Sequence, residues 1–310
     1  MSMAMVSILM LVSVAFYIVT ERKGLGMVQL RQGPNKVGLK GLIQPVADGV
    51  KLFTKEMVFP FYSIKMVFIL GPMICFICAY VLWSLFPSMY NSLGLSLGFL
   101  YFLCVSSFAV YGVFMVGWSC NSCYGFLGAM RAIAQSISYE VFLSTCLFCP
   151  LLLVGSYSLS SCRESEFPSV LLGEEVLILW IICILAETNR APFDFVEGES
   201  ELVAGYMVEF GGVGFALLAL AEYSNMTFMS MLTGILFFGF LLDGSFFGSF
   251  LFAFYMVGIS YFLVWVRGVV PRFRYDLLMS LCWKILLPVS ISVLVLFMGA
   301  LADLDLFVGF

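Results

Sequence analysis

Four glutamates lie in or beside apolar segments of this 310-residue chain, and the chain contains no histidine that could share proton transfer with them. An ionisable side chain at membrane depth costs several kcal/mol, about 3 on insertion scales, so it usually lines a polar path, pairs with a partner or takes up a proton. Burial also favours the protonated form of a carboxyl group. The pattern therefore predicts a path for protons through Glu140, Glu187, Glu209 and Glu222.

The densest group of charges follows the apolar segment 171–189. Six acids and one base, Arg190, lie between residues 187 and 209. If all were ionised and packed together they would repel one another, so some should share protons. A solvated acidic loop is the plain alternative. The acids are Glu187, Asp194, Glu197, Glu199, Glu201 and Glu209.

The position of Glu140 favours a path over a solvated loop. It stands seven residues into a helix expected to start at residue 133 on the inner face, which puts it about 10 Å deep. Glu187 ends a helix that reaches the same face. The acidic loop is thus expected to lead into the inner half of a helix bundle.

Composition places these carboxylates in a membrane. The chain is 62% hydrophobic and 11% charged, against about 25% charged for a soluble domain. Residues 66–130 carry no charge, which is room for two spans of about 20 residues. Residues 1–20 lack a basic start and a cleavage site, and are expected to be a retained first helix. We expect an all-α membrane protein, with residues 1–310 forming one integral membrane domain.

The distribution of basic residues predicts about eight spans. Counting 202–221 as a partly embedded or re-entrant helix places 14 of the 15 Lys and Arg on one side, with only Arg163 outside, and both termini outside. The large loops then lie on the basic side. The expected spans are 1–20, 67–86, 97–118, 133–155, 171–189, 223–242, 246–266 and 284–302.

The first basic loop, 21–65, is expected to contain an amphipathic helix. Its apolar residues recur at three- and four-residue spacing, its charged residues take the other face, and Pro45 suits a first turn. This pattern fits a helix lying on the membrane surface, and equally one packed against a soluble partner. The apolar residues are Leu42, Ile43, Val46, Val50, Phe53 and Met57.

Ten cysteines include three C-x-x-C pairs, which begin at Cys75, Cys120 and Cys146. Four thiolates at one depth could hold an iron–sulfur cluster, but these pairs project to different depths of different helices. With no histidine to complete a zinc or haem site, we expect the cysteines to act as small packing residues and predict no metal site. Glycine-rich nucleotide motifs are also absent from the sequence.

Five stretches closely resemble the subunit 1 family of mitochondrial-type respiratory NADH:ubiquinone oxidoreductase, complex I. The resemblance covers essentially the whole chain in order. The stretches are ERKGLGMVQLRQGPNKVGLKGLIQPVADGVKLFTKE, GAMRAIAQSISYE, AETNRAPFDFVEGESELVAGYMVEF, AEYSN and RGVVPRFRYDLLMSLCWK.

The resemblance implies a core membrane-arm subunit that forms the quinone-access chamber and begins a proton path. It implies ubiquinone as substrate, no cofactor in this chain, and flavin and iron–sulfur clusters in partner subunits. The implied partners are the other membrane-arm and peripheral-arm subunits and lipids, with no nucleic acid. The implied proton path is Glu140, Glu187, Glu201, Glu209 and Glu222, and the implied chamber and its loops contain Arg22, Arg31, Asp48, Glu56, Arg190, Asp194, Glu197, Glu199, Arg272 and Arg274.

Plainer roles exist for some of the basic residues. Arg22 could merely orient the first helix, and Arg272 and Arg274 could pair with Asp276 or with the acidic loop. The alternative functions are a stand-alone cation/proton antiporter and the membrane anchor of a hydrogenase. The mitochondrial inner membrane is the expected location, with the basic side in the matrix, and a bacterial plasma membrane is the alternative.

Overall fold

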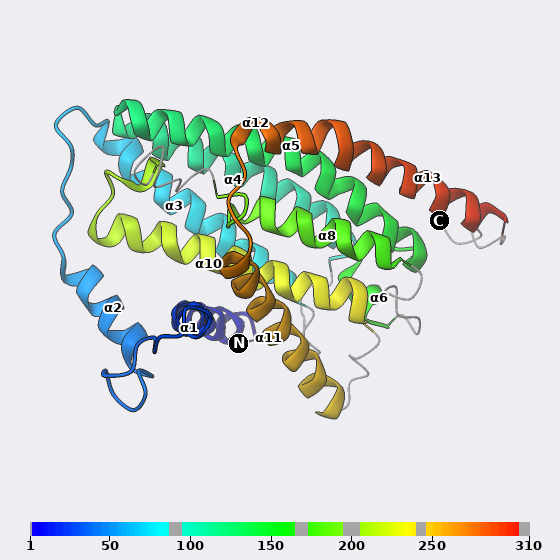
Figure 1. The fold of residues 1–310 in the computed structure, drawn as a ribbon, viewed down its shortest axis with the longest axis horizontal. Coiled ribbons are helices and arrows are strands. Elements are labelled where there is room, and N and C mark those ends of the chain that lie inside the picture. Colours follow the sequence, from blue (N-terminus) through cyan, green and yellow to red (C-terminus); the bar gives the residue numbers. More distant parts are fainter. Residues whose placement is uncertain (1, 87–94, 165–172, 195–204, 240–245, 304–310) are drawn as a thin grey trace.

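The computed structural model describes residues 2–86, 95–164, 173–194, 205–239 and 246–303. All regular secondary structure within these ranges is helical. Figure 1 shows a bundle in which α5 and α13 lie along one edge and α10 crosses the middle, while α11 diverges from the others. The shorter helices are α2 (Gln44–Thr54), α6 (Leu159–Glu164) and α8 (Glu174–Glu187), with the 3-10 turns η1 (Trp83–Leu85) and η2 (Gly205–Met207).

Six helical segments are long and apolar enough to cross a membrane, as a multi-pass membrane protein requires. The described part of the chain also contains the 27-residue α10 (Gly212–Phe238) and the shorter α8. The total of eight spans stays a prediction. The six segments are α1 (Ser2–Val28), α3 (Lys65–Leu82) with η1, α4 (Gly98–Cys120), α5 (Cys123–Val154), α11 (Phe246–Val269), and α12 (Tyr275–Leu281) continued by the π-helical η4 (Cys282–Leu286) and α13 (Leu287–Asp303).

Two expected boundaries are wrong. The start of α5 lies at Cys123 rather than residue 133, because Asn121 takes a left-handed conformation (φ 49°) and turns the chain directly out of α4. Glu140 is therefore 17 residues into its helix, roughly 25 Å from its start. The division at residue 222 between a re-entrant helix and a span is also wrong, since α10 continues past Glu222 with no proline to break it.

The first loop is shorter than expected. Helix α1 continues through Glu21 and Arg22 and ends at Val28, because no proline occurs until Pro34. Glu21 therefore lies on a bundle helix instead of in a surface loop.

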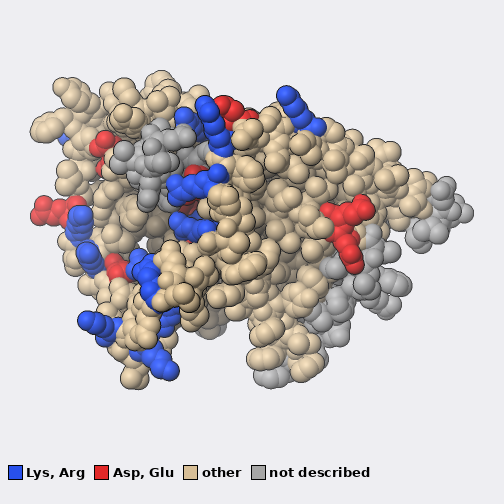
Figure 2. All heavy atoms as spheres, in the orientation of Figure 1, with Lys and Arg blue, Asp and Glu red and all other residues tan. Residues whose placement is uncertain are grey.

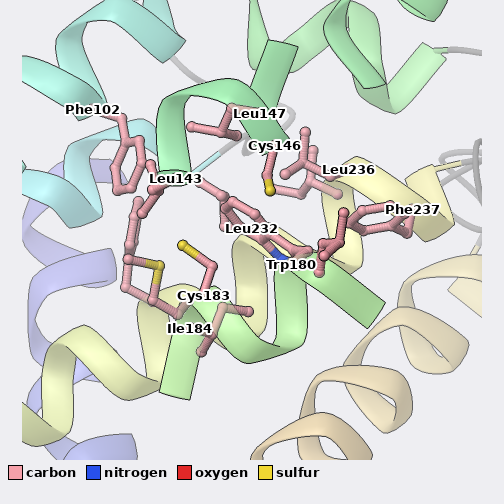
Figure 3. Close-up of a cluster of buried hydrophobic side chains, with 14 of the residues drawn as sticks. Phe102, Leu143, Cys146, Leu147, Trp180, Cys183, Ile184, Leu232, Leu236 and Phe237 are labelled. Carbon is pink, nitrogen blue, oxygen red and sulfur yellow. The ribbon is translucent and has the colours of Figure 1, made fainter. Parts of the chain in front are cut away.

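The core of the bundle is formed by α4, α5, α8 and α10. Figure 3 shows Trp180 and Cys183 of α8 lying among side chains of α5 and α10, including Leu143 and Leu232. All four of these side chains are fully buried. Burial of this apolar cluster fixes α8, and with it the position of the polar segment that follows α8.

Helix α2 lies apart from the bundle core, and an extended segment connects it to α3 (Figure 1). Its contacts are with α1 and α10. Pro45 is in its first turn, where its missing N–H leaves no hydrogen bond unmade. The side chains of Val46, Val50 and Phe53 are about 60% exposed (62, 58 and 61%). Helix α2 thus presents an apolar face that the described part of the chain leaves uncovered.

Candidate functional site

The most buried ion pairs join α1 to the segment after α8 and to α11. Glu21 is 3% exposed, and its Oε1 accepts hydrogen bonds from Arg190 Nη1 at 3.2 Å and from Arg267 Nη1. The Arg190 side chain is 7% exposed. Two guanidinium groups around one carboxylate compensate for its removal from water.

Two tyrosines complete this cluster. The Arg190 guanidinium lies over the ring of Tyr223, 4.5 Å from the ring centre. The ring of Tyr17 packs edge-on against Tyr223, with centres 5.9 Å apart. The Tyr17 hydroxyl donates to the carbonyl of Ser260 at 3.2 Å. Helices α1, α10 and α11 therefore meet at a polar centre surrounded by apolar residues.

Glu222 lies next to this cluster in the sequence, in the middle of α10. Its Oε1 accepts a hydrogen bond of 2.8 Å from the hydroxyl of Tyr206 in η2. Gly128 of α5 lets η2 approach closely, because a Cβ at this position would lie 2.8 Å from the η2 backbone. The close packing of α5 against η2 thus holds the hydroxyl that contacts Glu222.

Glu187 and Glu140 come from helices that pack together, α8 and α5. Glu187 Oε2 is buried and has no hydrogen-bond partner among the described residues. Glu140 is half-buried and lines a cavity of about 450 Å³ between α4 and α5, with Ser107 and Tyr111. This pair lies between the core and an opening in the bundle surface.

The segment that follows α8 is held from two sides. Asp194 is 3% exposed and pairs with Arg272 at 3.3 Å, and Phe193 stacks on Phe273. From α5, the Nε2 of Gln135 donates to the carbonyls of Ala186 and Phe193 at 2.8 and 3.0 Å. Arg190 and Asp194, which were predicted to act together, lie on this one segment.

The remaining basic candidates lie nearer the surface. Arg22 pairs with Asp48 at 2.7 Å and so connects α1 to α2. Arg31 is exposed and donates to the Gln29 side chain at 2.7 Å. Arg274 pairs with Asp276 at 3.4 Å, and both side chains are exposed.

The plainer partners considered for the arginines are therefore present, Asp276 for Arg274 and the acidic segment for Arg272. Glu56 is exposed and Glu209 is half-buried. Three predicted acids, Glu197, Glu199 and Glu201, lie outside the described residues.

Sequence reasoning missed Glu21, Arg267 and Gln135. It assigned Glu21 to a loop, although Tyr17 and Glu21 have the i, i+4 spacing of one helix face. Among the described residues, Arg190, the one base of the acidic segment, pairs with Glu21 of α1 and not with an acid of its own segment. The role of Gln135 could not be predicted from the sequence, because a single amide side chain in an apolar helix gives no indication of which carbonyls it donates to.

All ten cysteines are free thiols, and most are buried. Within the described ranges, no three His, Cys, Asp or Glu residues come close enough to hold a metal ion. Burial raises the pKa of the Cys162 thiol, in α6 outside the six spans, to about 12. This thiol is therefore protonated at neutral pH, as a packing residue would be.

Basic residues are gathered on one part of the surface. On the face shown in Figure 2, most Lys and Arg residues lie toward the side where Figure 1 places α2. This side also carries the Arg22–Asp48 pair. An asymmetric distribution of this kind is typical of the inner side of a membrane protein.

Comparison with known proteins identifies the family. The sequence profile of the family described as NADH dehydrogenase matches residues 1–298. The chain belongs to this family. It is 50% identical over 287 residues to NADH-ubiquinone oxidoreductase chain 1 of Heterololigo bleekeri, covering 92% of this chain and 91% of that protein. It is 45% identical over 294 residues to the protein of the same name from Aedes aegypti, covering 94% and 92%. The predicted resemblance to the subunit 1 family is therefore confirmed.

Proposed function

We propose that this chain is the membrane-arm subunit of a proton-translocating NADH:ubiquinone oxidoreductase that forms the quinone-access chamber and the first part of a proton path. Its relatives carry the name of chain 1 of that enzyme. The observation that supports the mechanistic part is a set of carboxylates among apolar helices: Glu21 is buried, Glu187 is half-buried with its Oε2 fully enclosed, and Glu222 is half-buried.

The quinone enters from the bilayer beside α2. Support comes from the exposed apolar face of α2 and from a cavity of about 440 Å³ between α1, η1, α10 and α11. This cavity is lined mainly by apolar side chains such as Met10 and Phe16, and it includes Tyr17 next to the Glu21 cluster. An apolar channel with one polar end suits a molecule with a hydrocarbon tail and a polar head.

Electrons come from iron–sulfur clusters in partner subunits, as the resemblance to the complex I family implies. Reduction of a quinone to a quinol takes up two protons and changes the charge near the Glu21–Arg190–Arg267 cluster. Because buried charges interact strongly, the carboxylates nearby respond by shifting protons. The Arg22–Asp48 pair, Arg31 and Glu56 organise the surface that meets the peripheral arm, together with Arg272 and Arg274.

The proton path continues from Glu222 toward Glu187 and Glu140. Glu187 is suited to hold a proton because its Oε2 is buried without a hydrogen-bond partner among the described residues. Glu140 opens into the cavity between α4 and α5, through which protons pass to neighbouring membrane-arm subunits. Glu209 and Glu201 extend this path on the side of the acidic loop, with Glu197 and Glu199 facing the chamber. The membrane is the mitochondrial inner membrane.

Glutamine variants at positions 140 and 187 test this function. Glutamine keeps the shape of glutamate but removes its titratable proton. Each variant should assemble into the complex, measured on a native gel, and should lose quinone reduction coupled to proton transfer, measured in vesicles. Full activity and full pumping in both variants would eliminate the proton path.

Arginine variants test the chamber separately. Arg31→Ala and Arg272→Ala should weaken quinone reduction, because a guanidinium holds carboxylates and loops with directed hydrogen bonds. Normal quinone kinetics in both variants would remove these residues from the chamber while leaving the proton path in place.

A further inference from the structure

Gln135 of α5 is the side chain that holds the polar segment after α8 at both ends. It is fully buried (0% exposed), and its amide nitrogen donates one hydrogen bond to Ala186 and one to Phe193. Ala186 lies in the last turn of α8, and its carbonyl also accepts a hydrogen bond of 3.3 Å from the Asn189 N–H. One amide group thus bridges the end of a helix and the chain seven residues later.

The two carbonyls stand directly beside the acids of the site. Ala186 precedes Glu187, and Phe193 precedes Asp194. Between them lies Arg190, which reaches Glu21. The segment makes its own turn, in which the Phe193 N–H donates to the Arg190 carbonyl at 2.8 Å. Whatever fixes Ala186 and Phe193 therefore also fixes the direction in which these three charged side chains point.

We propose that Gln135 is a positioning residue for proton coupling: its two hydrogen bonds hold the 186–194 segment, and so orient Glu187 and keep Arg190 and Asp194 on Glu21 and Arg272. This inference rests on the proposed function. Without the amide, the Phe193 carbonyl loses the hydrogen bond that ties it to α5, whereas the Ala186 carbonyl keeps one from the Asn189 N–H at 3.3 Å. The segment would then shift to find other donors, which changes the positions of its charges.

Two variants of the full chain in the assembled complex test this role. Gln135→Met keeps the length of the side chain and removes its polar atoms, and Gln135→Glu keeps its shape and removes both N–H donors. Ser136→Ala is the matched control, because the Ser136 hydroxyl bonds only to the Ile133 carbonyl of its own helix. Each variant is measured for complex content, for the kcat and KM of quinone reduction, and for protons translocated per quinone reduced.

Both Gln135 variants should assemble, and their kcat should fall roughly tenfold, the effect of two lost hydrogen bonds. The KM for quinone should stay within about twofold, and fewer protons should move per quinone. A merely structural role would lower the amount of complex and leave the proton ratio of each assembled complex unchanged. The Ser136→Ala control should match the parent in every measurement.

Parent-like kcat and proton ratio in both variants would overturn the inference, and so would failure of both variants to assemble, which would make Gln135 a folding residue. Glu187→Gln is measured in parallel. Impaired Glu187→Gln with normal Gln135 variants would refute only the role of Gln135, whereas normal pumping in both Glu187→Gln and Glu140→Gln would refute the proposed proton path itself.

Discussion

The substitution Glu21→Gln tests whether the buried cluster holds α1, the segment after α8 and α11 together. It removes the one carboxylate that Arg190 and Arg267 share. Breaking a buried ion pair by removing one partner costs about 3–5 kcal/mol, because the other charge remains buried and unpaired. The Arg190 side chain is 7% exposed and cannot reach water, whereas the Arg267 side chain is 26% exposed and can.

The expected loss for Glu21→Gln is therefore at the lower end of that range, about 3 kcal/mol, since the glutamine oxygen still accepts one hydrogen bond. Arg267→Gln should cost less, about 1.5 kcal/mol, because it removes one charged hydrogen bond near the surface. The assay is the amount of assembled complex on a native gel, together with the thermal unfolding midpoint of the solubilised complex.

Asp276→Asn is the control for this experiment. Its partner is Arg274, and the two side chains are 75% and 77% exposed. A surface pair of this kind contributes about 0–1 kcal/mol, so the midpoint should hardly change. Equal unfolding midpoints for Glu21→Gln and Asp276→Asn would refute the reasoning, because burial of an ion pair would then make no difference to its contribution to stability.

Three other variants test two neighbouring contacts and one cysteine pair. Gly128→Ala places a Cβ 2.8 Å from the η2 backbone and should lower stability by about 1–3 kcal/mol; an unchanged unfolding midpoint would contradict this close approach. Tyr206→Phe removes the hydrogen bond to Glu222 and should slow coupled quinone reduction severalfold; parent-like turnover would dismiss that contact as unimportant. Replacement of Cys120 and Cys123 by Ala should leave quinone reduction near normal, and loss of an iron–sulfur signal would show that they hold a cluster.

The helix bundle could be predicted from the sequence because long apolar segments indicate membrane spans. The long uncharged stretch 66–130 does contain most of two helices that are long and apolar enough to span a membrane, α3 and α4. Helix boundaries were harder to predict, because a helix continues through an apolar sequence until the backbone turns. At Asn121 the turn depends on a left-handed residue, and in α10 the expected break at Glu222 was inferred from charge alone.

The candidate acids were recognisable individually, but their partners were not. Glu187 and Glu222 stand out because charge is rare in apolar helices. The pairing of Arg190 with Glu21 joins residues 169 positions apart, and depends on how α1 packs beside α10 and α11. Sequence spacing carries no information on such a contact. The same is true of Gln135, whose role depends on two backbone carbonyls.

The central claim is that a buried carboxyl group changes its protonation when quinone is reduced. Infrared difference spectroscopy of the membrane-embedded complex, triggered by quinone reduction, measures this directly through the carbonyl stretch of protonated carboxyl groups. The parent should show a carboxyl band that is lost in Glu187→Gln and retained in the surface control Asp276→Asn. A carboxyl band of unchanged intensity in Glu187→Gln would contradict the claim that Glu187 carries the proton.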